Sequence, residues 1–188
     1  MRHFTQVADH VSIPILLYNV PGRTGVTIQP ETYRILSEHP NIRGTKEASG
    51  NLSLIARTAA LCGQGFDIYS GNDDQTVPIM SLGGKGVVSV LANIMPKETH
   101  KMVPSVPGWG CEGEQTDAAS ASGNHGSPVL GCKPHTSEDG PWLMGVCGDD
   151  LRLPLTPMEP EQRERLAEVM KRQGISLKKE LHNQTNLL

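Results

Sequence analysis

Short apolar segments alternate with helix-like segments along residues 13–90, and this alternation limits the folds open to the chain. Strand-like runs rich in branched residues lie at 13–18, 42–47, 66–69 and 86–90, and the sequence predicts helices over 30–37, 51–61 and 74–82. The strands begin roughly 20 to 30 residues apart with a helix in each gap, the spacing of βα units around a parallel sheet. The pattern predicts an α/β fold, either an open doubly wound sheet or part of a (β/α)8 barrel.

Composition and charge limit the kinds of molecule that the chain is expected to bind. Among 188 residues, 17 Lys and Arg stand against 20 Asp and Glu, so charge gives no reason to expect nucleic acid or an anionic membrane. The longest apolar runs are too short for a transmembrane helix, and no apolar segment of a secretory signal follows Met1. Four cysteines without C-x-x-C spacing predict neither a disulfide framework nor a zinc site. We therefore expect a cytoplasmic protein with no membrane or nucleic-acid partner.

Polar residues follow the predicted strands, where α/β folds build their sites. Lys46 ends an otherwise small or apolar strand, so desolvation would favour a neutral amine able to form a Schiff base with a ketone. Tyr18 ends the preceding strand and could relay a proton beside that amine. Arg23, in a turn-rich loop after that strand, could clamp a substrate carboxylate. The alternatives are a surface lysine, an amphipathic rim tyrosine and a solvated loop arginine.

Two further patterns predict no site. Residues 83–86, Gly-Gly-Lys-Gly, precede a strand, whereas a phosphate-binding loop lies between a strand and a following helix. The segment is therefore interpreted as a tight turn. The cysteines and histidines of the central region have spacings that fit no known metal site; they are Cys111, His125, Cys132 and His135. No metal is predicted.

Several motifs together carry a family resemblance. They are Tyr-Asn-Val-Pro-Gly-Arg-Thr-Gly at 18–25, Gly-Thr-Lys-Glu-Ala-Ser-Gly at 44–50, Tyr-Ser-Gly-Asn-Asp-Asp at 69–74, Gly-Gly-Lys-Gly-Val-Val-Ser-Val at 83–90 and Leu-Arg-Leu-Pro-Leu-Thr-Pro-Met at 151–158. In this combination the chain resembles the dihydrodipicolinate synthase family, which consists of class I pyruvate-dependent aldolases. The resemblance covers residues 1–103 and about 148–174.

The resemblance implies a function and a set of site residues. Lys46 would form the Schiff base with pyruvate, Tyr18 would donate and accept protons, Arg23 would hold the carboxylate of aspartate semialdehyde, and Val88 would contact pyruvate through its backbone. The family acts in the diaminopimelate route to lysine, works as a homotetramer and implies no metal or organic cofactor. N-acetylneuraminate lyase and the 2-keto-3-deoxy sugar acid aldolases share the Tyr and Lys, so another pyruvate aldolase is the alternative.

The resemblance also implies a domain organisation. Residues 3–10 look like the helix that precedes the family's fifth strand, so residues 1–103 would be the C-terminal half of a TIM barrel. Residues 148–188 would be the C-terminal helix and tail. The pyruvate-carboxylate threonines and a second tyrosine of the family belong to the earlier strands. We therefore expect the chain as written to be an inactive fragment, or a non-catalytic remnant that associates with intact subunits.

Residues 104–147 differ in composition from both flanks. They contain two leucines and neither isoleucine nor phenylalanine, so no amphipathic stripe is present and we expect disorder. Displacing a possible coding sequence for 133–139 by one nucleotide yields Asn-Pro-Ile-Pro-Val-Lys-Met, which resembles the family at this place. Residues 107–113 and 123–130 also become family-like in that frame. We interpret 104–147 as frameshifted; a genuine disordered insert is the alternative.

Overall fold

The structure, a computed structural model, describes residues 1–103 and 133–178 of the chain. The described residues belong to two compact units. The first combines residues 1–89 with the segment that begins at His100, and the second combines residues 90–99 with the C-terminal segment. None of the described helices is long and apolar enough to cross a membrane.

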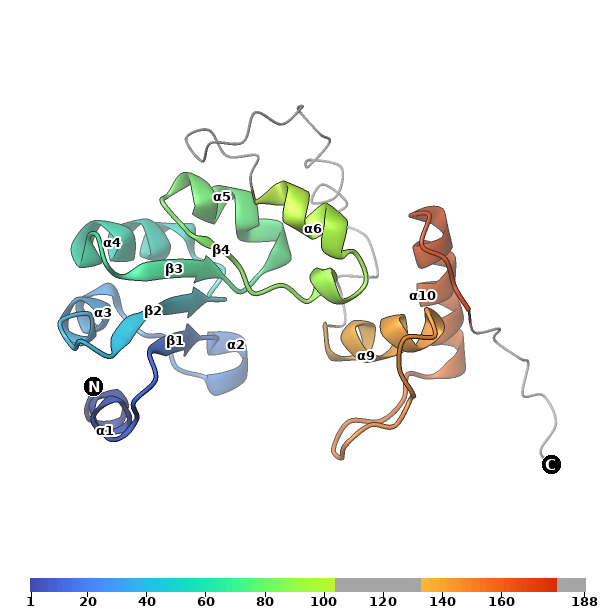
Figure 1. The fold of residues 1–188 in the computed structure, drawn as a ribbon, viewed down its shortest axis with the longest axis horizontal. Coiled ribbons are helices and arrows are strands. Elements are labelled where there is room, and N and C mark those ends of the chain that lie inside the picture. Colours follow the sequence, from blue (N-terminus) through green and yellow to red (C-terminus); the bar gives the residue numbers. More distant parts are fainter. Residues whose placement is uncertain (104–132, 179–188) are drawn as a thin grey trace. The chain divides into compact units, whose positions relative to one another are not determined.

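The first unit is built on a four-stranded parallel sheet (Figure 1). The strands pair in chain order, so each βα crossover places the next strand beside the last; they are β1 (Ile15–Asn19), β2 (Ile42–Glu47), β3 (Asp67–Ser70) and β4 (Gly86–Val87). All four strands coincide with predicted strands. The predicted fourth strand is longer than β4, because beyond Val87 the backbone N–H of Val88 still bonds to the carbonyl of Ser70 but the chain then enters a 3-10 turn at Leu91.

Helices fill the gaps between strands, and the local sequence explains where they begin. The helix α4 begins after Asn51, whose side chain accepts a hydrogen bond from the N–H of Leu54 at 3.0 Å, the N-cap predicted from the sequence. Pro30 is the first residue of α3, a position where a backbone N–H would have no partner within the helix, so the N–H that proline lacks is not needed. The helical elements of this unit are α1 (Arg2–His10), α2 (Pro21–Thr24), α3 (Pro30–Leu36), α4 (Leu52–Cys62), η1 (Asp73–Gln75) and α5 (Thr76–Ser81).

The two faces of the sheet differ in exposure. Successive side chains alternate between faces, so Leu17 and Asn19 of β1 are buried while Leu16 and Tyr18 are about half exposed. The buried face packs against helices in one core, whose members are Ala8, Leu17, Tyr33, Leu36, Ile42, Ile55, Phe66, Ile68 and Ile79. The other face, carrying Leu16, Tyr18, Lys46 and Tyr69, is called the open face below.

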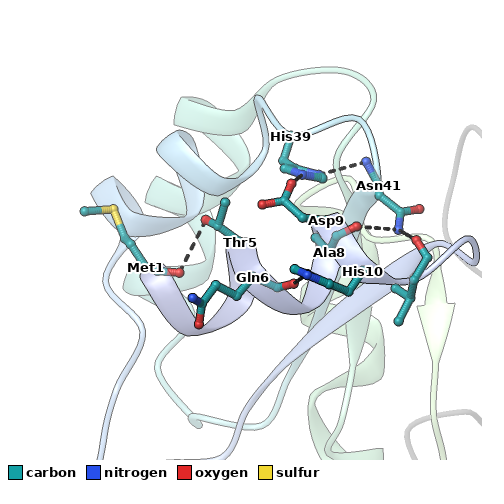
Figure 2. A network of polar contacts seen from close by, with 9 residues as sticks. Met1, Thr5, Gln6, Ala8, Asp9, His10, His39 and Asn41 are labelled. Carbon is teal, nitrogen blue, oxygen red and sulfur yellow. Dashed lines mark hydrogen bonds and ion pairs between the residues drawn. The ribbon is translucent and has the colours of Figure 1, made fainter.

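A polar network fastens α1 to the segment before β2 (Figure 2). The side-chain amide of Asn41 donates to the carbonyls of Ala8 (3.2 Å) and Val11 (2.9 Å), which caps the end of α1. The backbone N–H of Asn41 donates to Nδ1 of His39, so the proton of the neutral ring lies on Nε2, 3.0 Å from Oδ1 of Asp9. The helix before the first strand is thus held to the sheet at both its backbone and its side chains.

The second unit contains η2 (Leu91–Asn93), most of α6 (Pro96–Met102), α9 (Lys133–Leu143) and α10 (Pro160–Arg172). An ion pair joins the last two helices: Arg163 Nε donates to Oδ1 of Asp139 at 2.6 Å, and the Asp139 side chain is 2% exposed. The Arg163 guanidinium also lies 4.1 Å from the ring centroid of Trp142. The predicted C-terminal helix is present as α10.

Residues 133–143 lie within the segment expected to be disordered, and the structure describes them as the helix α9. Their own sequence lacks an amphipathic stripe, but tertiary contacts stabilise α9: Leu143 is fully buried, and the missing Cβ of Gly140 leaves room for Ile94, whose Cγ2 would lie 2.6 Å from it. Burial of a few side chains can override weak local propensity. The expectations for residues 104–132, including the frameshift interpretation there and the discounted Cys111, His125 and Cys132, lie outside the described residues.

Candidate active site

The structure brings Lys46 and Tyr18 together on the open face. In the parallel register Tyr18 of β1 faces Lys46 of β2, and Lys46 faces Tyr69 of β3, so the three residues form one row across the sheet. Nζ of Lys46 lies 4.2 Å from the centroid of the Tyr18 ring, a cation–π contact. Sequence reasoning predicted that these two residues meet, and the register is what places them side by side.

The strand period explains why Lys46 points to the open face. Its neighbours Thr45 and Glu47 are fully buried on the helix-covered face, whereas Lys46 is only partly buried. A long side chain in this position can rest its methylenes on the sheet and keep its amine at the surface. The amine is therefore accessible to a small carbonyl compound, as a nucleophile must be.

A buried carboxylate lies directly behind the lysine, and sequence reasoning assigned it no role. Glu47 accepts hydrogen bonds from Tyr33 Oη at 2.6 Å, from Ser49 Oγ at 2.8 Å, and from Asn19 Nδ2 at 3.0 Å. The hydroxyl of Thr45 donates to the Tyr33 oxygen at 3.1 Å. Asn19 directly follows Tyr18 and Glu47 directly follows Lys46. The hydrogen bond between their side chains therefore links the end of β1 to the end of β2.

The network changes the pKa of the Tyr33 phenol. Burial, and next the negative charge of Glu47, raise the pKa of Tyr33 above its ordinary value. Tyr33 therefore stays a neutral hydrogen-bond donor. The signal available in the sequence was the alternation itself, because period 2 directs Asn19 and Glu47 into the core, where polar groups need partners.

Arg23 lies on α2, a single helical turn directly after β1 that replaces the expected loop. The turn closes with Gly25 in the left-handed region (φ 68°), where its N–H donates to the carbonyl of Pro21 at 2.8 Å. The Arg23 side chain is exposed and forms no ion pair with any described residue. The guanidinium is available at the carboxyl end of β1, but the structure records no contact between it and Lys46.

Val88 directly follows β4, at the opposite edge of the sheet from Arg23. Its N–H already donates to the carbonyl of Ser70 at 2.8 Å, so only its carbonyl can offer a backbone contact to a ligand. The four predicted residues therefore follow or end strands at one end of the sheet, with Tyr18 and Lys46 in contact and Arg23 and Val88 on either side.

No metal site accompanies these residues. Within residues 1–103 and 133–178, no three His, Cys, Asp or Glu side chains gather closely enough to hold a metal ion. The groups found at the carboxyl ends of the strands are an amine, a phenol, a guanidinium and a backbone carbonyl, which suit a small polar anion with a carbonyl group.

Comparison with known proteins identifies the family of the chain. The model of the dihydrodipicolinate synthetase family matches residues 1–130. The chain belongs to this family. Over 178 residues it is 44% identical to the 4-hydroxy-tetrahydrodipicolinate synthase of Caldicellulosiruptor saccharolyticus, a match that covers 95% of this chain and 60% of the relative. The Clostridium acetobutylicum protein named 4-hydroxy-tetrahydrodipicolinate synthase 1 is likewise 44% identical over 179 residues, with 93% and 60% covered.

Solved structures of the family share the fold. Dihydrodipicolinate synthase from Aquifex aeolicus superposes with a TM-score of 0.79 at 34% identity, covering 95% of this chain and 61% of that one. The Cyanidioschyzon merolae enzyme with lysine bound gives 0.82 at 34% identity, with 93% and 60% covered. The predicted partial TIM barrel and the family resemblance are confirmed, and the chain spans about 60% of the length of its dihydrodipicolinate synthase relatives.

Proposed function

We propose that this chain carries the imine-forming part of a pyruvate-dependent aldol reaction, with Lys46 as the nucleophile. The observation that supports it most directly is the contact of the Lys46 amine with the Tyr18 ring, 4.2 Å from its centroid, at the carboxyl end of the strands. Relatives 44% identical to the chain are named 4-hydroxy-tetrahydrodipicolinate synthase. The aldol acceptor we propose is aspartate semialdehyde, in the diaminopimelate route to lysine.

The proposed chemistry needs an amine and a proton carrier. The neutral amine of Lys46 adds to the ketone carbon of pyruvate, water leaves, and the resulting iminium ion loses a methyl proton to give an enamine. The enamine carbon attacks the aldehyde carbon of the acceptor, and hydrolysis then releases the product and restores the amine. Tyr18, beside the amine, would move the protons, because its phenol can both donate and accept.

Arg23 and Val88 would hold the substrates. The exposed guanidinium of Arg23 can bind the acceptor carboxylate through two parallel hydrogen bonds. The carbonyl of Val88, whose N–H is already bonded to Ser70, would contact pyruvate. We further propose a cytoplasmic location, supported by the free thiols of Cys62 and Cys147, and self-association of the kind implied by the family resemblance.

Borohydride trapping tests the proposal without requiring turnover. The chain is incubated with pyruvate, reduced, digested and analysed by mass spectrometry. We expect a reduced pyruvate adduct on the peptide that carries Lys46. The variant Lys46→Arg should lose the adduct, and the matched control Lys97→Ala, which removes an exposed lysine of α6, should keep it. Adduct on a different lysine, or equal adduct in Lys46→Arg, would overturn the assignment.

The acceptor is tested separately. The unreduced enzyme–pyruvate imine is challenged with aspartate semialdehyde before borohydride is added, or the chain is incubated with N-acetylneuraminate and 2-keto-3-deoxy sugar acids in the cleavage direction. Consumption of the imine by aspartate semialdehyde alone supports the synthase reaction. Cleavage of a sugar acid instead would assign the chain to another pyruvate aldolase. Size-exclusion chromatography with light scattering reports self-association in the same samples.

A further inference from the structure

Gly71, directly after β3, lies against the side chain of Lys46. A Cβ placed on Gly71 would be 3.1 Å from Cε of Lys46, 2.9 Å from Cβ of Ala48 and 3.1 Å from the carbonyl oxygen of Glu47. All three distances are shorter than ordinary contact between such atoms. The Lys46 stem therefore passes through space that exists only because residue 71 has no side chain.

Backbone conformation does not explain the glycine. The glycines with positive φ are Gly25, Gly50, Gly63, Gly65, Gly83, Gly86, Gly145 and Gly174, and Gly71 is not among them. Its φ is not in the region that favours glycine, so what position 71 requires is the absence of a side chain rather than a positive φ.

The backbone at Gly71 is held in place and cannot move away from Lys46. Its N–H donates to the carbonyl of Glu47 at 2.7 Å, which ties the end of β3 to the end of β2. The preceding residue, Ser70, accepts the N–H of Val88 at 2.8 Å and donates through Oγ to the carbonyl of Asn72 at 2.7 Å. Because both sides are hydrogen-bonded, added volume at residue 71 must displace a neighbour.

We propose that Gly71 is a positioning residue for the nucleophile: its missing Cβ lets the Lys46 side chain take the path that brings its amine to the Tyr18 ring. This inference rests on the proposed role of Lys46 in imine formation. Addition of an amine to a ketone depends on the approach of the two atoms, and a displacement of about 1 Å can cost about a hundredfold in rate. A methyl group that moves Cε by a fraction of that distance should slow imine formation about tenfold.

The experiment has to separate this effect from damage to the fold. In Gly71→Ala the new methyl group would overlap the rigid Cβ of Ala48 and strain the backbone. Ala48→Gly removes that overlap, the shortest of the three, and leaves the contacts with the mobile Lys46 stem and with the carbonyl oxygen of Glu47. The informative comparison is therefore Ala48→Gly against the double variant Ala48→Gly/Gly71→Ala. The matched control is Gly22→Ala, because a Cβ at Gly22 would meet nothing within 4 Å.

The first readout is the position of the side chain itself. In protein labelled with [ε-13C]lysine, the Lys46 signal is assigned by its loss in Lys46→Arg, and Tyr18→Leu gives its frequency without the ring current. We expect the signal in the double variant to move from the Ala48→Gly value towards the Tyr18→Leu value, while Gly22→Ala leaves it unchanged. An unchanged signal in the double variant would overturn the inference, whether or not the chain forms an imine.

The second readout is the rate of borohydride-trapped pyruvate adduct at Lys46. We expect it to fall about tenfold in the double variant relative to Ala48→Gly and to be unaffected in Gly22→Ala. An unaltered rate in the double variant would overturn the positioning role even if the carbon signal moves. Absence of any Lys46 adduct in the unmodified chain would instead refute the proposed function. The carbon signal would still show whether Gly71 determines the position of the Lys46 side chain.

Discussion

Removal of one hydroxyl, in Tyr33→Phe, tests the buried network behind the lysine. The Tyr33 side chain is fully buried, and its hydroxyl donates to Glu47 at 2.6 Å and accepts from Thr45 at 3.1 Å. Phenylalanine keeps the ring and its packing, so the change isolates the hydrogen bonds. Glu47 keeps its bonds from Ser49 and Asn19, so the carboxylate is not left without donors.

The expected cost follows from the type of bond. Hydrogen bonds to charged groups contribute about 1.5–3 kcal/mol to stability, and the buried Thr45 hydroxyl keeps only its longer contact, 3.3 Å to the carbonyl of Leu17. We expect the free energy of unfolding to fall by about 2 kcal/mol, measured by urea titration followed by far-UV circular dichroism. The matched control is Tyr69→Phe, whose hydroxyl forms no hydrogen bond with a described residue and which should change stability by less than about 0.5 kcal/mol.

The pH dependence gives the same prediction a sharper test. Burial and the charge of Glu47 raise the folded-state pKa of Tyr33, so the phenol is neutral in the folded chain at pH values where it ionises in the unfolded chain. Its contribution is therefore complete below about pH 10, the ordinary tyrosine pKa, and declines above it. The stability difference between the unmodified chain and Tyr33→Phe should be constant from about pH 7 to 9 and then shrink by about 1.4 kcal/mol per pH unit.

Two results would refute this reasoning. A loss below about 0.5 kcal/mol at pH 7 would mean that the hydroxyl bonds contribute no more than an exposed polar group. A difference that stays constant up to pH 11 would mean that Tyr33 ionises equally in the folded and unfolded chains. The first result would remove the network as a stabilising element of the strand ends, and the second would refute the raised folded-state pKa of Tyr33.

Three further predictions concern other parts of the molecule. Asp139→Asn leaves Arg163 without its buried partner and should destabilise the second unit by about 3–5 kcal/mol, seen as lost amide-exchange protection in α10. Gly44→Ala would place a Cβ 2.1 Å from a carbonyl oxygen of β3 and should cost about 3 kcal/mol or more in thermal unfolding. Because burial raises the pKa of the Cys62 thiol, iodoacetamide at pH 7.5 should alkylate Cys62 several-fold more slowly than the exposed Cys147, as read by mass spectrometry.

Local physics let the sequence predict the four strands and the helices α3, α4 and α5 of the first unit. Branched runs bounded by turn residues predicted all four strands, and Asn51 predicted the start of α4, because capping and strand alternation act within a few residues. At α9 the local sequence pattern does not predict the helix that the structure describes. A segment without an amphipathic stripe forms a helix there because Leu143 and Asp139 find partners far along the chain.

The candidate site was likewise predicted in part from the sequence and decided in part by the tertiary structure. Position at the predicted strand ends singled out Lys46, Tyr18 and Arg23, since residues that end or follow strands of a parallel sheet share one edge, and the family resemblance added Val88. Only the register between β1 and β2 placed the Lys46 amine over the Tyr18 ring. In the sequence alone, nothing distinguishes Gly71 from a glycine that forms a turn.

Tertiary structure alone decided what surrounds the lysine. The donors to Glu47 come from β1, α3 and the segment after β2, and the neighbours of Gly71 belong to a different βα unit. Such contacts depend on how twisted strands and their covering helices pack, which is a property of volumes and distances rather than of residue order. The sequence by itself determined which residue types end the strands, and packing determined that Glu47 lies buried among its donors and that Gly71 lies against the Lys46 side chain.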